Sequence, residues 1–197
     1  MDTLASEAIR TRMLLLRHGA VDWSRATDGE PPLAEAGLLD AELAASTLPY
    51  FDVIVASAQR ATQETAEAIA GRRAVLLLWR EGLDEIRTSA VLQDATTCAE
   101  WVDRLFGAYE ASEEGESLAD AVARMTAALR AIGDRYYGRS ILVVSHPIIL
   151  LAFRAHLLGM TVLRDQVDAM PDLAMAIVDY LEGRFYLVQD FPIRIVT

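Results

Sequence analysis

The sequence predicts the α/β class, as a three-layer α/β/α sandwich with a mostly parallel sheet and a C-terminal hairpin. Short apolar runs that are typical of buried strands alternate with helical segments along most of the chain. Strands separated by helices favour parallel pairing, with helices covering both faces of the sheet. Near the end of the chain, Glu182-Gly183 lies between two apolar segments and suits the two-residue turn of a hairpin.

Each predicted element follows from a local pattern. Four short apolar runs predict buried strands at residues 13–17, 52–56, 75–79 and 141–144. Helical patterns predict helices over residues 33–48, 58–70, much of 90–109, and Pro147–Leu158. A further long helix begins at Gly115 or Ser117, after an acidic loop at residues 112–116, and ends near Gly133. Ser57 is the expected N-cap of the second helix, and residues 174–181 and 184–189 are the strands of the hairpin.

Length and composition fit a single domain over residues 1–197. Apolar residues make up 53% of the chain and charged residues 24%, so a sizeable core is expected. The formal net charge of -11 argues against a general nucleic-acid binder and against docking on an anionic membrane. Lysine is absent, as is asparagine, and this excludes P-loop, Schiff-base and Ser-Lys chemistry.

The chain carries no pattern that targets it to a membrane or to export. Residues 1–12 are polar and acidic, unlike a signal peptide, and the apolar run at residues 13–16 is too short to span a bilayer. Cys98 is the only cysteine, so no disulfide can form within the chain. We therefore expect a cytoplasmic protein with no nucleic-acid or membrane partner. The oligomeric state stays open, and a homodimer is possible.

Chemically active side chains follow the predicted strands at the point where each strand ends. The segments are Arg17-His18-Gly19 after the first strand, Ser57 with Arg60 after the second, Leu83-Asp84-Glu85-Ile86 after the third, and Ser145-His146 after the fourth. In open α/β sheets, ligands bind beyond the carboxyl ends of the strands. We therefore expect two histidines, two arginines and one glutamate to converge on one crevice.

This set of side chains suits phosphoryl transfer. A neutral imidazole can attack phosphorus directly, and arginine binds phosphate oxygens bidentately while staying charged. The helix N-termini after Ser57 and His146 are expected to add N–H groups for an anion. A protonated carboxylate, such as that of Glu85, can protonate the leaving alkoxide.

The same segments resemble the histidine phosphatase superfamily, in its phosphoglycerate-mutase-like branch that includes small bacterial phosphatases. The resemblance covers most of the chain, and the order and spacing of its segments are specific. Those segments are residues 14–19, Pro32-Leu33 through Gly37 and Ala41, residues 53–61, 65–68, 83–86 and 143–146.

The resemblance implies a phosphoglycerate-mutase-like fold and a phosphatase that acts on a small phosphorylated substrate. His18 would attack the phosphoryl group and become phosphohistidine, while Arg17, Arg60 and His146 hold its oxygens. Glu85 would be the acid for the leaving group and then the base for water. No metal and no other cofactor is implied, and the three histidines of the chain are too few for a histidine-rich metal site.

The chain departs from the family pattern at three positions. Val21 and Ser24 stand where the family often has Thr and Asn, so Ser24 is expected to give a weakened phosphate contact. Pro147 replaces the usual Gly after the second histidine. Proline suits the first position of a helix but has no N–H, and we expect the amides of Ile148 and Ile149 to compensate.

Several alternatives stay open. The chain lacks the Arg-Arg-Tyr segment expected of phosphoglycerate mutases, which favours hydrolysis over mutase chemistry. A non-catalytic or weakly active module that binds phosphate or a partner on the same fold is the main alternative, and fold alone does not separate the two. Arg60 could simply pair with an acidic neighbour, and Glu85 could be a solvated acid. His156, in an apolar helical run, is expected to be structural.

Two further interpretations concern residues 88–117. Cys98 and Arg104 have the spacing of a tyrosine-phosphatase motif, but Glu100 and Asp103 lie between them and would repel phosphate, so a helix is expected there instead. We expect this segment to recognise the leaving group. Trp101 and Tyr109 would then line a pocket or pack helices.

Overall fold

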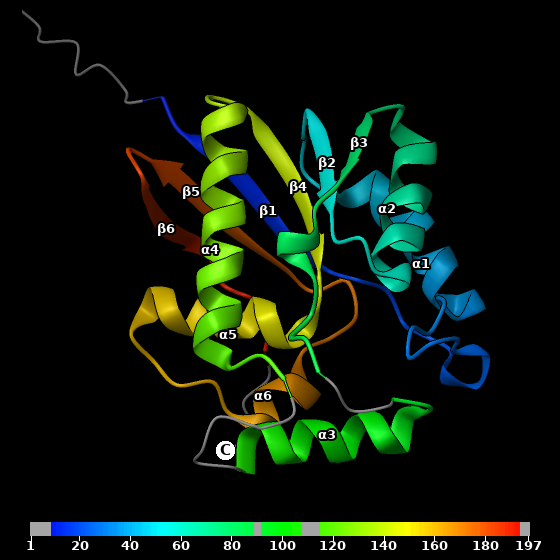
Figure 1. Cartoon of the computed structure of the whole chain (residues 1–197). Coiled ribbons are helices and arrows are strands. Elements are labelled where there is room, and N and C mark those ends of the chain that lie inside the picture. Colours follow the sequence, from blue (N-terminus) through cyan, green and yellow to red (C-terminus); the bar gives the residue numbers. More distant parts are fainter. Residues whose placement is uncertain (1–8, 89–91, 108–114, 194–197) are drawn as a thin grey trace, which may run out of the picture.

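The computed structural model describes residues 9–88, 92–107 and 115–193 and confirms the α/β class (Figure 1). The strands of its sheet are β1 (Thr11–Arg17), β2 (Val53–Ala56), β3 (Leu76–Trp79), β4 (Ser140–Ser145), β5 (Met175–Leu181) and β6 (Arg184–Gln189). They lie in the order β3-β2-β4-β1-β5-β6. The pairs β2·β3, β2·β4 and β1·β4 are parallel, whereas β5 pairs antiparallel with β1 and with β6.

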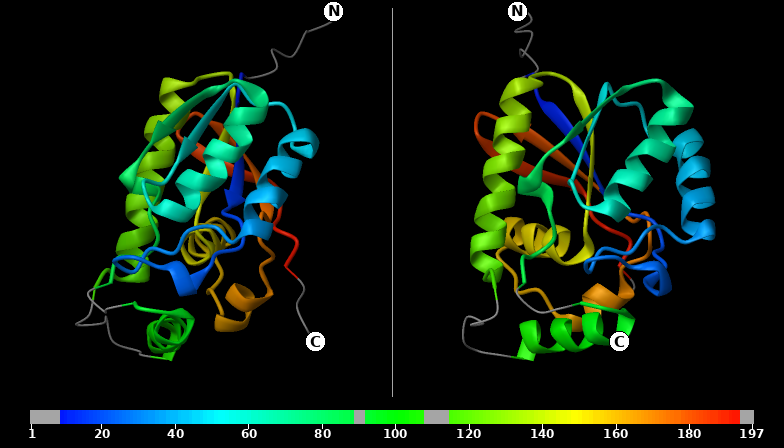
Figure 2. Two further views of the ribbon diagram at one scale, coloured as in Figure 1. Left: turned by 90° about the vertical axis from the view of Figure 1, so that its right-hand side faces the viewer. Right: turned by 45° about the vertical axis from the view of Figure 1, so that its right-hand side comes forward.

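Helices cover both faces of this sheet and one of its ends. They are α1 (Glu35–Thr47), α2 (Arg60–Arg73), α3 (Ala95–Gly107), α4 (Leu118–Arg135), α5 (Pro147–Leu158) and α6 (Arg164–Ala169), with short 3-10 turns η1 (Trp23–Arg25) and η2 (Glu81–Leu83). The helices α4 and α5 lie on one face and α1 and α2 on the other, while α3 and α6 lie beyond the carboxyl ends of the parallel strands (Figures 1 and 2).

Two separate apolar clusters fill the spaces between the three layers. Successive side chains of a strand point to opposite faces of its sheet. In β1, Met13 and Leu15 therefore pack in the cluster that contains α4 and α5, whereas Leu14 and Leu16 pack with α1 and α2. The central strands are buried on both sides, as their continuous apolar runs predict.

The hairpin is confirmed, with Glu182 at φ 49° and Gly183 at φ 78° between β5 and β6. A type I′ turn requires a positive φ at both of its central residues. Ser117 is confirmed as the N-cap of α4, where its side chain accepts the amide of Asp120. The predicted loop at residues 112–116 and the ends of the predicted helix at 90–109 lie partly outside the described residues.

One strand start, one short helix and one N-cap are the main differences from the predictions. The strand β1 begins at Thr11, two residues early, because Thr11 pairs with Tyr180 of β5. The six-residue helix α6 has too short a pattern to be predicted. Ser57 is not the N-cap of α2: Gln59 holds that position, and the Ser57 hydroxyl accepts its amide at 3.1 Å.

The packing of α4 on the sheet leaves no space at Gly133. A Cβ there would lie 2.4 Å from Cδ1 of Tyr180, whose hydroxyl is held by Asp134 at 2.7 Å. We expect Gly133→Ala to lower the free energy of unfolding by about 2 kcal/mol, because the ring cannot retreat. The control is Gly71→Ala in α2, where a Cβ would meet nothing within 4 Å and should raise stability by about 0.5 kcal/mol. Urea unfolding measures both, and equal shifts for the two variants would contradict this packing.

Candidate active site

The ends of β1 and β4 place the two histidines side by side. Arg17 is in register with Ser145, and the amide of His18 donates to the carbonyl of Ser145 at 3.0 Å. The rings of His18 and His146 follow, with centroids 5.2 Å apart. Both line a cavity of about 1160 Å³ at this end of the sheet, together with Arg17, Arg60 and Glu85. The structure thus brings the five predicted side chains to one cavity.

His18 presents an unprotonated ring nitrogen. Its Nδ1 lies 2.8 Å from the carbonyl oxygen of Gly19, and since a carbonyl can only accept, the ring proton belongs on Nδ1. The Nε2 atom then carries the free lone pair of the neutral ring. Burial, with the nearby Arg17 guanidinium, lowers the pKa of His18 to about 4, so the ring is neutral at physiological pH.

Arg17 has one buried donor that no group among the described residues satisfies. Its terminal nitrogens bind the Met170 carbonyl and, at 2.9 Å, the carboxylate of Asp172. In the described part of the chain, its buried Nε has no hydrogen-bond partner. A buried charged donor without a partner costs free energy unless a ligand meets it. Burial also lowers the pKa of Arg17 below its ordinary value. The ordinary pKa of arginine is so high that the guanidinium still keeps its charge.

Glu85 is held at the N-terminus of α5. Its carboxylate accepts the amides of Ile148 at 3.0 Å, Ile149 at 2.9 Å and Ile86 at 3.0 Å. Burial raises the pKa of Glu85 to about 7, although these amide bonds act in the opposite direction. A carboxyl group with a pKa near neutrality can both donate and accept a proton at physiological pH. Glu85 is therefore not the solvated acid that was considered as an alternative.

The two predicted anion sites at helix N-termini are already filled by carboxylates of the protein. At α5, where Pro147 is the first residue as predicted, the amides of Ile148 and Ile149 donate to Glu85. Ahead of α2, the amide of Ala58 donates to Asp84 at 3.1 Å, and that of Arg60 donates to Glu30 at 3.0 Å. The expectation that Ile148 and Ile149 replace the missing amide of Pro147 on phosphate is therefore wrong for this state.

Arg60 lines the cavity, yet its guanidinium is engaged elsewhere. Its Nε donates to Glu64 at 2.9 Å and one terminal nitrogen donates to Thr27 at 3.2 Å. The pair is one helical turn apart in α2, and the Arg60 side chain is 37% exposed. Because a pair this exposed contributes little stability, the guanidinium is not tightly fixed.

Ser24 lies away from the other predicted residues. It is exposed in η1, and its hydroxyl donates to Asp22 at 2.6 Å. The cavity wall includes its neighbours Trp23 and Val21 but not Ser24. The structure thus does not bring Ser24 to the histidines.

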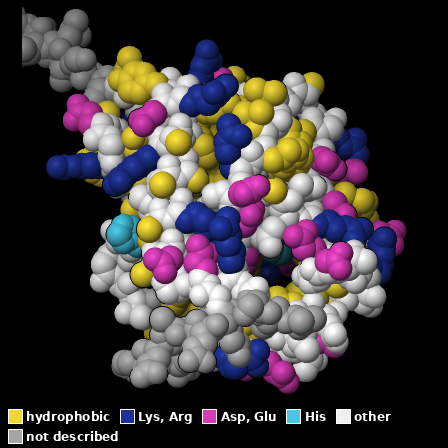
Figure 3. All heavy atoms as spheres, in the orientation of Figure 1, with side chains coloured by type: hydrophobic (Ala, Val, Ile, Leu, Met, Phe, Trp, Pro, Cys, Tyr) yellow, Lys and Arg dark blue, Asp and Glu magenta, His cyan; other side chains and the backbone are white. Residues whose placement is uncertain are grey.

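The outer wall of the cavity comes from α3 and α6. Trp101 and Cys98 of α3 line it, as do Arg164 and Val167 of α6. The two helices are joined by Arg164, which donates to Asp103 at 2.8 Å. Tyr109, the other residue predicted for this wall, lies outside the described residues. Figure 3 shows that acidic and basic side chains are interspersed over the face of the molecule seen in Figure 1.

Cys98 is not an activated nucleophile. It lies in α3, as predicted, and burial raises the pKa of its thiol to about 11. The thiolate needed for attack is therefore scarce at physiological pH. His156, by contrast, is exposed on α5 and lies outside the cavity wall.

Two features of other protein classes are not found in the part of the chain that the structure describes. No group of three or more His, Cys, Asp or Glu side chains is placed to hold a metal ion among the described residues. Over the same residues, no helix combines the length and the apolar character needed to cross a membrane.

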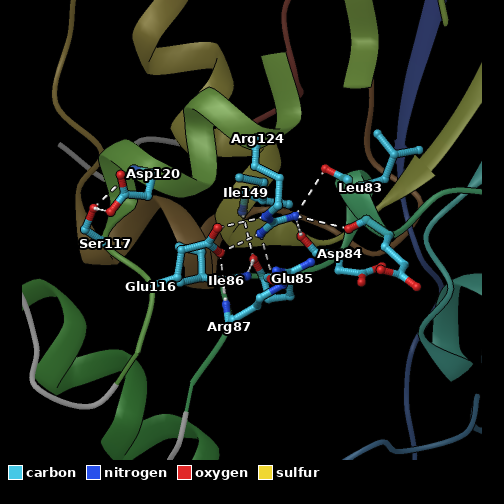
Figure 4. Close-up of polar contacts among 12 residues, drawn as sticks. Leu83, Asp84, Glu85, Ile86, Arg87, Glu116, Ser117, Asp120, Arg124 and Ile149 are labelled. Atoms are coloured by element: carbon cyan, nitrogen blue, oxygen red, sulfur yellow. Dashed lines mark hydrogen bonds and ion pairs between the residues drawn. The ribbon is translucent and has the colours of Figure 1, made fainter. Parts of the chain in front are cut away.

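Arg124 holds the chain segment that carries Glu85, a role that no pattern in the sequence indicates (Figure 4). From α4, its guanidinium binds both carboxylate oxygens of Glu116, at 2.8 and 2.6 Å. It also donates to the carbonyls of Asp84 at 3.0 Å, Gly82 at 3.1 Å and Glu85 at 3.2 Å. The Arg124 and Glu116 side chains are only 14% and 13% exposed. One guanidinium thus fixes the backbone on which Glu85 is mounted.

We expect Arg124→Ala to lower the free energy of unfolding by about 3 kcal/mol, because it removes the cation from Glu116, which keeps only the amide of Arg87 at 3.2 Å, and the donor from the bound carbonyls. Arg130→Ala is the control, since Arg130 is exposed on the same helix and its loss should change stability by less than about 0.5 kcal/mol. Denaturant unfolding measures both variants. Equal small effects would show that Arg124 does not support this segment.

Comparisons with known proteins agree with this geometry. The sequence profile of the histidine phosphatase superfamily (branch 1) matches residues 13–190. Relatives named probable phosphoglycerate mutase GpmB, from Yersinia pestis and Yersinia pseudotuberculosis, are 27% identical over 185 residues, which covers 87% of this chain and 86% of theirs. Among solved structures, YhfR of Bacillus stearothermophilus is similar, with a TM-score of 0.77 and 25% identity over 91% of this chain and 96% of its own.

Two further solved structures share the fold at lower identity. Phosphoserine phosphatase of Entamoeba histolytica, in complex with 3-phosphoglyceric acid, has a TM-score of 0.73 and 20% identity over 92% of this chain and 96% of its own. Phosphoglycerate mutase of Bacillus anthracis has a TM-score of 0.74 and 16% identity over 93% of this chain and 94% of its own. The fold is therefore phosphoglycerate-mutase-like, and this chain belongs to the histidine phosphatase superfamily, branch 1.

Proposed function

We propose that this chain is a phosphomonoesterase that hydrolyses small phosphorylated substrates through a phosphohistidine on His18, without a metal ion or other cofactor. One observation carries the proposal. The unprotonated Nε2 of His18 belongs to a cavity in which the neighbouring Arg17 keeps a buried, unpartnered Nε–H. A nucleophile beside an unsatisfied cationic donor is what an incoming phosphoryl group requires.

The reaction then runs in two steps. In the first, Nε2 of His18 attacks phosphorus, the ester P–O bond breaks, and protonated Glu85 gives its proton to the leaving oxygen. In the second, ionised Glu85 takes a proton from water as the water oxygen attacks phosphorus. The P–N bond breaks, which frees His18 and inorganic phosphate and restores the proton on Glu85. The pKa of Glu85, about 7, allows both roles.

The phosphoryl oxygens are held by side chains in this proposal. Arg17 offers its Nε–H, His146 lies beside His18, and Arg60 exchanges Glu64 for the phosphate by a rotation of its half-exposed side chain. Each such contact that strengthens as charge develops contributes about 3 kcal/mol of transition-state stabilisation. Ser24 has no role, because it is exposed and bonded to Asp22.

Mutase chemistry is the second candidate, because the Yersinia relatives are named probable phosphoglycerate mutases. Against it, the chain lacks the Arg-Arg-Tyr segment expected of such enzymes. Incubation with 3-phosphoglycerate separates the two, since a phosphatase releases inorganic phosphate and a mutase forms 2-phosphoglycerate. A non-catalytic phosphate-binding module would do neither and would fail on every phosphomonoester.

His18→Ala is expected to lower the turnover of an aryl phosphate by at least about a thousandfold, because the variant has no nucleophile. His156→Ala is the matched control, since His156 is exposed on α5 and should be replaceable without loss. Wild-type turnover should persist in excess EDTA. Phosphate release measures all three. Normal turnover by His18→Ala would show that the nucleophile is misassigned.

The pH dependence should report His18 and Glu85. With an alkyl phosphate, kcat/KM should be lost below pH about 4, where His18 becomes protonated, and above pH about 7, where Glu85 loses its proton. The ionisation of the substrate itself, at pH about 6, is common to all variants.

Glu85→Gln should slow the alkyl phosphate by about a hundredfold and an aryl phosphate much less, because only the poor leaving group needs the acid. Glu67→Gln, exposed on α2, is the control for the substitution itself. Steady-state rates over a pH series measure these effects. Equal losses on both substrates would argue against Glu85 as the acid.

A further inference from the structure

A chain of hydrogen bonds runs from His146 through Ser57 to Asp84. The Nε2 atom of His146 lies 2.9 Å from the Ser57 hydroxyl, and that hydroxyl donates to Oδ1 of Asp84 at 2.7 Å. Oδ1 also accepts the amide of Ala58 at 3.1 Å. The three residues follow β4, β2 and η2, so they meet only because the strand ends meet. The two-step reaction above does not use Ser57 or Asp84.

The order of donors and acceptors along these hydrogen bonds fixes the tautomer of His146. A carboxylate can only accept, so the single hydroxyl proton of Ser57 is given to Asp84. The Ser57 oxygen is then left as an acceptor, for the amide of Gln59 at 3.1 Å and for His146. Nε2 of His146 therefore carries the proton, and Nδ1 is the unprotonated nitrogen of the neutral ring. His18 has the opposite tautomer, with its proton on Nδ1.

The hydrogen bond between Ser57 and His146 is buried. Ser57 is fully buried, and His146 is 6% exposed, so water cannot replace a lost partner. Burial holds the pKa of His146 well below the ordinary value, and His18, Arg124 and Arg17 act in the same direction. Asp84 is the carboxylate to which the ring is hydrogen-bonded, through one hydroxyl.

We propose that Asp84, acting through Ser57, is a positioning residue for His146 that sets the tautomer and orientation of its ring. When phosphate binds, Nδ1 of the ring takes a proton from solvent, and Asp84 supplies the negative charge that stabilises the protonated ring. The assignment of His146 to phosphate rests on the proposed function; the tautomer does not. An acid that orients a histidine through a hydrogen bond also stabilises its protonated form. Here the carboxylate of Asp84 acts on His146 indirectly, through the Ser57 hydroxyl.

The competing interpretation is purely structural. Because Asp84 accepts the amide of Ala58, it could serve only to tether the chain ahead of α2. Asp52 provides a matched control for that role. It tethers the start of β4 by accepting the amide of Ser140 at 2.9 Å and pairs with Arg139, at the opposite end of the sheet from the histidines.

The first test reads the tautomer directly, without turnover. The chain has three histidines, so the ring nitrogens of His146 can be assigned by 15N NMR with His146→Gln as reference. In the wild type, Nε2 should show the protonated signal. In Asp84→Ala, the freed Ser57 proton turns to Nε2, and the ring proton should move to Nδ1. Asp52→Ala should leave the wild-type pattern. A folded Asp84→Ala that keeps the Nε2–H tautomer overturns the proposal.

The second test uses inorganic phosphate as the probe. Asp84→Ala and Ser57→Ala should each bind phosphate about tenfold more weakly by titration calorimetry, the loss typical of removing an orienting partner. Asp84→Asn can still accept from Ser57 and Ala58, so it should keep the tautomer but lose affinity because it lacks charge. Asp52→Ala should bind as the wild type does. Unchanged affinity in Asp84→Asn and Asp84→Ala overturns the electrostatic role.

The outcomes separate this inference from the proposed function. If the wild type binds phosphate and Asp84→Ala shows the tautomer change, but the wild type hydrolyses no phosphomonoester, the phosphatase assignment fails and the inference stands. If the wild type is a phosphatase but the tautomer of His146 is the same in the wild type and in Asp84→Ala, the inference fails and the phosphatase assignment stands.

Discussion

The parallel register between β1 and β4 is the constraint on which the site depends. It sets Arg17 opposite Ser145 and so delivers His18 and His146 as neighbours at the sheet end. A slip of one residue would turn every side chain of a strand to the opposite face. The two apolar clusters forbid that slip, because residues of opposite parity in β1 are buried against different helices. The packing of the core thus fixes the positions of His18 and His146 relative to each other.

Around this pair, carboxylates of the protein lie where a ligand's negative charge would be expected. Glu85 occupies the N-terminus of α5, Glu30 and Asp84 bind the first amides near α2, and Asp172 binds Arg17. Free amides at a helix start would attract any anion without regard to its shape. With those positions filled, the proposed function leaves recognition of phosphate to the side chains of Arg17, Arg60 and the histidines.

Much of the fold could be predicted from the sequence, because the buried strands are continuous apolar runs and their ends carry the polar residues. The convergence of His18, Glu85 and His146 on one cavity could be predicted in this way. The roles of Arg124 and Asp84 were not, since an arginine in a helix, or an aspartate in a loop, has no local pattern that reveals a partner dozens of residues away. Ser24 was assigned from its place in the chain, but its own neighbour Asp22 satisfies its hydroxyl. The start of α2 was missed because Ser57 binds across the sheet end rather than capping the helix.

The absence of lysine has a consequence for how this cavity responds to its surroundings. Every side-chain cation that lines it, from Arg17 to Arg164, is a guanidinium. A guanidinium keeps its charge over the whole range in which proteins stay folded, whereas a buried ammonium readily loses a proton. The positive charge that the arginines bring to the site is therefore the same over this whole pH range. Only the imidazole and carboxyl groups can change their charge with pH. A pH titration of this cavity therefore reports the protonation of those groups, while the positive charge of the arginines stays constant.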